Sequence, residues 1–430
     1  MKQFKFILLA ILFISMLAGC DQQSARDNRI YISDKKQAQY KSALPWTFGT
    51  PVVWDKMKFD YRRGQLTVLP FFSLDAFFSE HTQLDLCSYN LSKMDFKDRA
   101  NDLWFASFDN NTIWPDILPE NFDPESIMQL GKNPCLNLRA LHEKDITGDG
   151  IGIAIAGRSY LAPHSEYKER VKLYQQNGAV KDIMSTEGTE AVSIAAGSTL
   201  GVAPGAYIYY FADSSGGLKG NQDDIKTRQW AIQTIERVME INKTLPLKYK
   251  IRVICFLSDW FSDSEGYEAL IHSVKEARQD GIFVISQGIY ETYQCVIKGL
   301  GRGVLSDPDN LSSYNPKYVN SSERYTVNYN RKFGIAYEDE ILFVPMGSRC
   351  VASPTGENDY KFSNAGSPRQ TISFISGMYA LACQVRQDIT PEIFLKCALE
   401  TGEPRKNADG EVIGEAINPV RLIDRIQSMK

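Results

Sequence analysis

Short apolar runs alternate with longer helical patterns from about residue 121 onward. Runs typical of buried strands lie at 150–157, 206–212, 251–258, 282–288 and 341–346. Apolar residues recur at helical spacing over 187–197, 223–242, 265–279 and 372–385. Thr390 followed by Pro391 predicts the N-cap and first position of one more helix. Buried strands that alternate with helices favour an α/β fold, in which a mostly parallel sheet is covered on both faces.

Three predicted strands end in residues that suggest where a site would lie. Gly157, Ser258 and Gly288 stand at the carboxyl ends of these strands. Because ligands of open parallel sheets bind at that edge, we expect a functional site near these residues.

The N-terminal part of the chain has a different pattern. Lys2 and Lys5 precede a short apolar run at 6–17, and the segment ends in LAGC with Cys20. This order predicts a signal peptide over 1–20. LAGC resembles the lipobox of bacterial lipoproteins, which implies lipidation of Cys20 and a lipid-anchored protein on the extracytoplasmic face of the cell membrane. An ordinary signal peptide with a chance cysteine is the alternative.

The rest of the chain divides into a polar tether at 21–42, an accessory region at 43–120 and a main domain at 121–430.

Composition narrows the classes of partner. The 430 residues are 43% hydrophobic and 23% charged, and the net charge is −4. A slightly negative net charge does not indicate a nucleic-acid partner, and it does not indicate a polybasic patch that would bind a membrane surface.

The cysteines and short acidic loops predict no cofactor and no metal. None of the eight cysteines stands in a CxxC pair, and no Cys/His pair has metal-ligand spacing. Cys255 and Cys383 lie in apolar runs and are predicted core thiols. The acidic stretches at 148–150 and 307–310 are more typical of turns than of calcium sites.

One segment resembles a known catalytic motif. STEGTEAVSIAAG at 185–197 is followed by STLGVAPGA, and it is similar to the HGTHVAG segment of the subtilisin-like serine peptidases, family S8. The stretches GKNPCLNLRALHEKDITGDG, HSEYKERVKLY, LSDPDN, ASPTGENDY and GMYALACQV further resemble a Gram-positive, lipoprotein-like branch of that family. The resemblance covers 121–430 and implies a subtilisin-like three-layer α/β fold with a mostly parallel sheet, preceded by an accessory region.

The resemblance also implies where a catalytic triad would stand, and all three positions are altered. Acyl transfer of this kind needs an aspartate, a histidine base and a serine nucleophile. The aspartate position holds Gly157, the histidine position holds Glu187, and a gap-free register puts Arg369 at the serine position. Glycine offers no acceptor, and arginine cannot attack a carbonyl. Glu187 near a helix N-terminus also has a simpler interpretation, as a helix-capping acid.

Other candidates remain open. Ser367 and Ser373 are alternative nucleophiles if the register slips, and Ile289 stands where the family has its oxyanion asparagine. Ser258, Asp259 and Trp260 lie where the resemblance places the peptide-binding edge. The four histidines, none of which is expected to act as the base, are His81, His142, His164 and His272.

Three hypotheses follow for function. The first is a membrane-anchored, catalytically inactive pseudopeptidase that binds peptide or protein. The second is an active endopeptidase with Ser–Glu chemistry like that of sedolisins, which share the fold and place a glutamate where Glu187 stands. Those enzymes also need a second acid, and one turn after Glu187 comes Glu190 or Ala191. The third is a structural or regulatory partner of an active relative.

Overall fold

The structure is a computed structural model. It describes residues 63–66, 84–177, 185–213, 221–258, 266–286, 293–315, 340–406 and 410–429. The predicted signal peptide and tether, with Cys20, lie outside the described residues. The same holds for three candidate site residues, Asp259, Trp260 and Ile289.

The central sheet has five parallel strands in the order β4-β5-β3-β6-β7. Their bounds are β3 Gly152–Gly157, β4 Val171–Asn177, β5 Tyr207–Asp213, β6 Ile251–Phe256 and β7 Phe283–Ile285. Every residue of β3, β6 and β7 is buried, as expected of strands covered on both faces.

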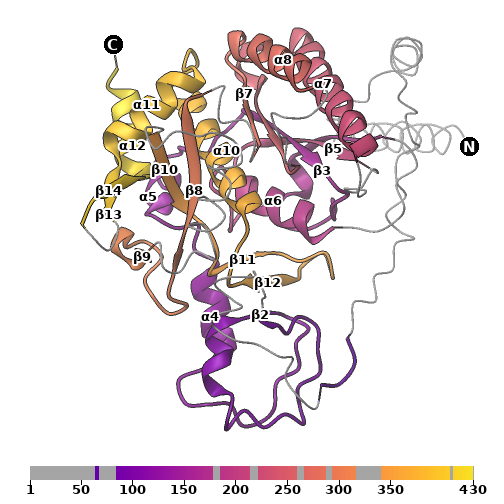
Figure 1. The fold of residues 1–430 in the computed structure, drawn as a ribbon, viewed down its shortest axis with the longest axis vertical. Coiled ribbons are helices and arrows are strands. Elements are labelled where there is room, and N and C mark those ends of the chain that lie inside the picture. Colours follow the sequence, from indigo (N-terminus) through magenta and orange to yellow (C-terminus); the bar gives the residue numbers. More distant parts are fainter. Residues whose placement is uncertain are drawn as a thin grey trace, which may run out of the picture.

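Helices cover both faces of this sheet (Figure 1). α7 (Asn221–Thr244) and α8 (Tyr267–Gln279) share one apolar cluster with alternate residues of the strands. α6 (Thr186–Ala196) and α10 (Pro368–Val385) share the other cluster with the intervening strand residues. The expected fold class, a three-layer α/β arrangement with a mostly parallel sheet, is therefore confirmed.

A second sheet lies beside the first, in the order β13-β14-β10-β8-β9 (Figure 1). β8, β10 and β14 pair in parallel, and β13 and β9 pair antiparallel at the two edges. The bounds are β8 Cys295–Arg302, β9 Tyr314–Asn315, β10 Glu340–Pro345, β13 Glu403–Lys406 and β14 Val412–Ala416.

A third, smaller sheet joins the accessory region to the C-terminal half, in the order β1-β2-β12-β11. Its strands are β1 Leu84–Asp85, β2 Ala106–Asp109, β11 Arg349–Ala352 and β12 Tyr360–Ser363. Phe108 of β2 pairs with Phe362 of β12, and both belong to one apolar cluster. Residues far apart in the sequence thus share this sheet and its core.

The remaining elements are short or peripheral. They are the 3₁₀ turns Ala100–Phe105, Lys168–Arg170, Leu247–Tyr249 and Leu311–Ser313, with α4 Pro124–Gly131, α5 Leu138–His142, α11 Pro391–Thr401 and α12 Pro419–Gln427. Thr390 caps α11 by accepting a hydrogen bond from the Ile393 amide, as predicted. Within the described ranges, no helix combines the length and the apolar character that a membrane span requires.

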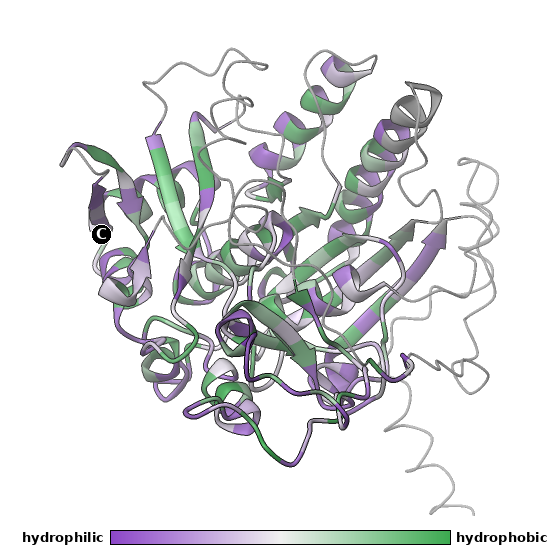
Figure 2. Cartoon of the chain, turned by 60° about the horizontal axis from the view of Figure 1, so that its bottom comes forward, coloured by the Kyte–Doolittle hydropathy of each residue, from purple (hydrophilic) through white to green (hydrophobic). Residues whose placement is uncertain are grey.

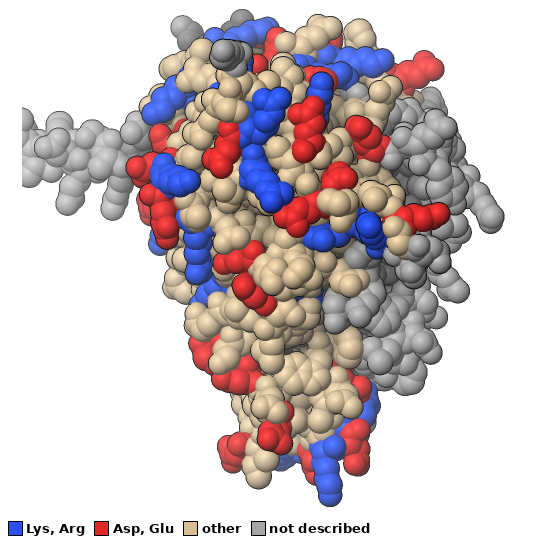
Figure 3. Space-filling model, turned by 90° about the vertical axis from the view of Figure 1, so that its left-hand side faces the viewer, with Lys and Arg blue, Asp and Glu red and all other residues tan. Residues whose placement is uncertain are grey.

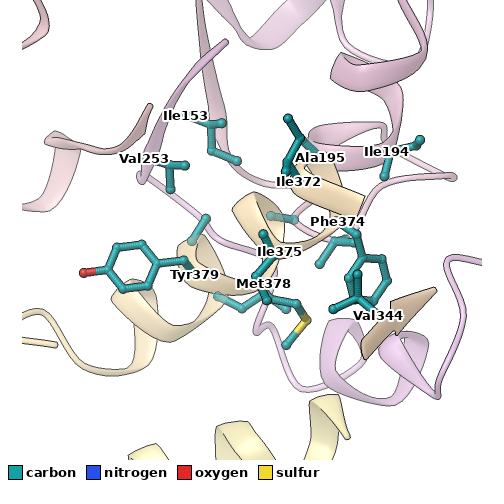
Figure 4. Packing of buried hydrophobic residues seen from close by; sticks show 14 of the residues in the cluster. Ile153, Ile194, Ala195, Val253, Val344, Ile372, Phe374, Ile375, Met378 and Tyr379 are labelled. Carbon is teal, nitrogen blue, oxygen red and sulfur yellow. The ribbon is translucent and has the colours of Figure 1, made fainter. Parts of the chain in front are cut away.

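α10 is almost wholly buried, and many of its residues belong to the main apolar cluster. Ile372, Phe374 and Met378 project from it into the surrounding apolar residues (Figure 4). A Cβ at Gly377 would lie 2.6 Å from Val202 Cβ and 2.9 Å from the Ala195 carbonyl oxygen, so only glycine permits this close approach to α6. The helix begins at Pro368, four residues before the predicted start, because its polar first turn carries no apolar periodicity.

The distribution of polarity agrees with this architecture. Apolar residues gather on the inner strands and on the inward sides of the helices, and polar residues lie mostly on the outside (Figure 2). Cys255 and Cys383 are fully buried free thiols, which confirms their predicted place in the core.

Candidate functional site

The site lies at the carboxyl edge of β3 and β6. These two strands are hydrogen-bonded neighbours, and Ala156 pairs with Phe256. Gly157 ends β3, and Leu257 follows β6 with its amide donating to the Ala156 carbonyl at 2.8 Å. Gly157 and the Leu257–Ser258 segment therefore lie next to each other, as the sequence predicted.

α6 brings Glu187 to this edge. Its N-cap is Ser185, whose Oγ accepts a hydrogen bond from the Glu187 amide at 3.1 Å. The Ser185 amide in turn donates to the Ser159 carbonyl at 2.7 Å, which ties the helix start to the segment after β3. Ser185 is therefore the N-cap residue of α6, and Glu187 is the acid in its first turn, where the helix dipole favours a carboxylate. The Glu187 carboxylate also has room for a side-chain partner.

Arg369 is that partner. It is the second residue of α10, and its Nη1 atom lies 3.3 Å from Glu187 Oε1. Its Nε atom also donates to the Leu257 carbonyl at 2.9 Å. About a third of each of the two charged side chains is exposed (35% for Arg369 and 34% for Glu187). The structure thus brings Glu187 and Arg369 together as an ion pair, and these are the residues that the resemblance aligns with the histidine and the serine of a triad.

Gly157, which the resemblance aligns with the aspartate of a triad, faces the Leu257 side chain. A Cβ at Gly157 would lie 2.9 Å from Leu257 Cδ1 and 3.0 Å from Leu257 Cβ. A carboxylate could occupy this position only if Leu257 moved. Leu257 therefore contributes twice to the site, through its carbonyl to Arg369 and through its side chain against Gly157.

The two alternative nucleophiles have different surroundings. Ser373 is fully buried inside α10, and its Oγ donates to the Arg369 carbonyl at 2.8 Å, as a helical hydroxyl commonly does. Ser367 is the half-buried N-cap residue of α10 and makes no side-chain capping bond. Among the described residues, no hydrogen bond joins Ser367 to Glu187. Neither serine is therefore paired with a base.

Glu190, one turn after Glu187, is engaged elsewhere. Its Oε1 lies 3.1 Å from Lys361 Nζ, and its Oε2 accepts from Gln370 Nε2 at 3.3 Å. Both side chains of the Glu190–Lys361 pair are mostly buried. Burial disfavours the charged lysine, but attraction to Glu190, together with Cys87 and Asp85, outweighs it and raises the pKa of Lys361. Glu190 therefore does not support Glu187 as a second acid would.

The described histidines have structural roles. His164 is buried; its Nε2 donates to the Asp359 carbonyl at 2.9 Å, and its Nδ1 accepts from the Glu166 amide at 3.2 Å. Burial lowers the pKa of His164 and keeps it neutral. His142 contacts the Val202 carbonyl at 2.9 Å, and His272 pairs with Glu276 on the exposed side of α8. His81 lies outside the described residues.

The two acidic turns have no metal-binding arrangement. Asp309 Oδ1 accepts from the Asn137 amide at 2.7 Å, and Asp309 Oδ2 accepts from Asn133 Nδ2 at 2.7 Å. Within the ranges that the structure covers, no group of three or more His, Cys, Asp or Glu side chains is placed to hold a metal ion.

Of the predicted peptide-binding residues, Ser258 is the one that the structure describes. It follows Leu257 directly, and its hydroxyl is buried without a hydrogen-bond partner among the described residues. The sequence did not predict the contacts that Leu257 makes with Arg369 and Gly157. A leucine at a strand end gives no signal of such a role.

Comparisons with known proteins give likenesses to solved structures alone. No protein-family model and no curated protein matches the chain. Similar solved structures include the prenylagaramide maturation protease PagA, 16% identical, with a TM-score of 0.44 and coverage of 68% of this chain and 99% of that one.

Two further examples have similar values. The PatG macrocyclase in complex with peptide is 13% identical, with a TM-score of 0.46 and coverage of 68% of this chain and 96% of that one. A chain of the subtilase cytotoxin SubAB assembly is 13% identical, with a TM-score of 0.43 and coverage of 68% and 95%. Likenesses at these values carry no argument about activity, so the proposals below depend on the residues of this chain.

Proposed function

We propose that this protein is a peptidase-like domain that binds peptide or protein without hydrolysing it. The observation that carries the proposal is the ion pair between Arg369 and Glu187 at two positions where acyl transfer would need a nucleophile and a base. An ionised guanidinium has no lone pair with which to attack a carbonyl, and it has only hydrogen-bond donors. The neighbouring carboxylate is committed to that cation.

The third position supports the same proposal. A catalytic imidazole needs an acceptor that fixes its tautomer and orientation. Gly157 offers none, and the Leu257 side chain fills the adjacent space. Restoring hydrolysis would therefore require at least four coordinated changes, at Gly157, Glu187, Arg369 and Leu257.

Peptide binding is supported by the edge at which these residues lie. Extended peptides bind to such edges by adding a strand, and side-chain pockets then select among them. Ser258, with its unpartnered hydroxyl, begins the segment expected to receive the peptide, and Asp259 and Trp260 continue it. Trp260 is the side chain that we propose anchors a ligand, because aromatic residues often dominate the binding energy of such contacts. The alternative is that Trp260 fills the pocket and closes it.

The test measures cleavage and binding in one sample. The purified protein is incubated with a mixture of unstructured casein-derived peptides at pH 4 and pH 7, cleavage is followed by mass spectrometry, and binding is followed by fluorescence anisotropy. We expect bound peptide and no new termini, and Trp260→Ala should weaken binding about tenfold or more. Products that disappear with a serine-directed inhibitor and in Glu187→Gln would instead establish an active Ser–Glu enzyme. Absence of binding to any peptide would refute the peptide-binding part.

We also propose that the protein is anchored by lipid at Cys20, on the extracytoplasmic side of the cell membrane. The order of charged, apolar and small residues before Cys20 supports this placement. Growth with labelled palmitate should label the native protein and leave Cys20→Ser unlabelled. Label retained in Cys20→Ser would contradict the anchor.

A further inference from the structure

A buried arginine outside the candidate site lacks the partners that its charge requires. Arg349 is the first residue of β11, and 1% of it is exposed. Its Nη2 donates to the Leu200 carbonyl at 3.3 Å. Its Nε and Nη1 atoms are buried and have no hydrogen-bond partner among the residues that the structure describes. Three of the five N–H donors of a guanidinium are therefore unused.

Burial of the positively charged Arg349 guanidinium without a counter-charge costs free energy. A guanidinium keeps its positive charge in proteins, and an isolated charge removed from water is strongly destabilising unless it is paired. Among the described residues, no carboxylate lies within ion-pair distance of Arg349. The guanidinium carbon lies 5.9 Å from the centre of the Phe374 ring, a contact that offsets only part of the cost.

A second buried arginine close to Arg349 adds positive charge to its surroundings. Arg302 is also buried, and its Nη2 donates to the carbonyl of Ser348, the residue before Arg349. Tyr314 and Cys350 are two titratable groups that interact electrostatically with both arginines. Burial raises the pKa of the Tyr314 hydroxyl far above its usual range and that of the Cys350 thiol to about 12, so both stay neutral at physiological pH.

Two other buried arginines show how this protein satisfies such groups with carbonyls. Arg252 uses all three nitrogens, on the carbonyls of Gly281, Gln387 and Ile389 at 2.6–3.0 Å. Arg302 donates through Nη1 to three carbonyls, of Gly303, Val304 and Ser306, although its Nε is buried without a partner among the described residues. Arg349 has one long contact instead, and the loop that provides it is fixed because Glu166 accepts from the amides of Thr199 and Leu200. The Leu200 loop therefore cannot turn further toward Arg349 without breaking those bonds.

We propose that Arg349 belongs to a buried binding site for a small monovalent anion of the halide class, with chloride as the ligand available in solution. The anion accepts hydrogen bonds from the unused N–H groups of Arg349, and it offsets the excess charge of Arg349 and Arg302. The burial of Arg349, of which 1% is exposed, favours a small anion over a polyatomic one such as phosphate. The site is separate from the Arg369–Glu187 pair and does not depend on the proposed function.

The first experiment measures thermal unfolding of the folded protein in sodium chloride, sodium bromide and sodium gluconate at one ionic strength. A ligand that binds the native state raises the melting temperature with its logarithmic concentration. We expect a rise of about 1–3 °C for each tenfold increase in chloride above its dissociation constant, and no rise with gluconate. Equal melting temperatures in all three salts would overturn the proposal.

Two variants and one diffraction measurement make the assignment specific. Arg349→Met should remove the chloride dependence, whereas Arg252→Met should lower the melting temperature and retain that dependence, because Arg252 is fully satisfied by carbonyls. If Arg349→Met does not fold, crystals of the native protein grown in bromide decide the question. An anomalous bromine peak within hydrogen-bond distance of Arg349 supports the site. Ordered water there, without an anomalous peak, contradicts it.

Discussion

Arg369 and Glu187 form a pair whose strength is limited by exposure. About a third of each side chain is in contact with solvent (35% and 34%), so water and salt weaken their attraction. Arg369 keeps a second partner in the Leu257 carbonyl at 2.9 Å. At the residue scale, the pair therefore adds little to stability, and its main effect is that the side chains of Arg369 and Glu187 engage each other.

Substitution of Glu187 and of Glu190 compares the stability contributed by a partly exposed ion pair with that of a mostly buried one. Glu187→Gln should change the free energy of unfolding by less than about 1 kcal/mol, because its pair is half-exposed. Glu190→Gln should cost about 3 kcal/mol, because it leaves the mostly buried Lys361 without its closest counter-charge. Urea unfolding of both variants measures the two values. A larger loss for Glu187→Gln than for Glu190→Gln would contradict this account.

The buried Glu166 carboxylate predicts how the free energy of unfolding depends on pH. Burial raises its pKa, but hydrogen bonds from Thr199, Tyr360 and Leu200 outweigh burial and lower it below the ordinary value of 4.5. A carboxylate with a lowered folded-state pKa stabilises the fold above that ordinary value and loses the effect as pH falls. Glu166→Gln should therefore cost roughly 2 kcal/mol at pH 7, and the difference from the native protein should shrink below pH 4.5. Glu169→Gln, at an exposed neighbour, should show neither effect in urea unfolding across pH.

At the scale of elements, the end of β3 packs against the segment after β6, and the contact is between Gly157 and the Leu257 side chain. Gly157→Ala should destabilise the protein by about 1–3 kcal/mol, because the new Cβ meets Leu257 at 2.9 Å. Leu257→Ala should remove most of that penalty. A double-mutant cycle measures the coupling. Additive effects of the two substitutions would show that the two residues do not share this space.

The pairing of β2 with β12 is one of the contacts that join the accessory region to the rest of the described chain. Phe108 lies 5.4 Å from Phe362 and 5.3 Å from Trp114, measured between ring centres. Phe108→Ala should cost about 3–5 kcal/mol and increase hydrogen exchange of the Lys361 and Phe362 amides. Ile117→Ala is the control: Ile117 is 85% exposed in the same region, so its loss should change stability by less than about 0.5 kcal/mol. Unchanged exchange in Phe108→Ala would show that β12 is held by other contacts.

The elements that could be predicted from sequence are those with uninterrupted patterns. β3 and β6 lie within the predicted runs, because each is a continuous apolar stretch. β8 was missed because Lys298, Gly299 and Gly301 interrupt its apolar residues. β11 and β12 were missed because strands of four residues are too short for a periodic signal.

The candidate site could be predicted in part. Aligning the EGT and GMYALA stretches put Glu187 and Arg369 at neighbouring positions, and the structure places them 3.3 Å apart. The pairing of Glu190 with Lys361 joins residues 171 positions apart. Neither that pairing nor the position of the Leu257 side chain follows from spacing, because both depend on how β12, α6 and β6 pack together. The unpartnered Arg349 also could not be foreseen, since burial is a property of the folded chain.

At the scale of the whole molecule, the candidate site is held by the best-packed part of the structure. α10 contacts both larger sheets and α6, and its first turn carries Arg369. Charged side chains of both signs are interspersed over the face shown in Figure 3. A largely buried helix therefore positions Arg369 at the candidate site, and Glu187 balances the charge of Arg369 there.

The most direct test of the proposal that the protein does not hydrolyse peptides is active-site labelling of the purified native protein with a fluorophosphonate probe, at pH 4 and pH 7, followed by peptide mapping. This probe forms a covalent bond with a serine that a neighbouring base activates. The account predicts no adduct at Ser367, Ser373 or any other serine, and the same result for Glu187→Gln. An adduct at Ser367 that Glu187→Gln abolishes would contradict it, because Glu187 would then act as a base beside a working nucleophile.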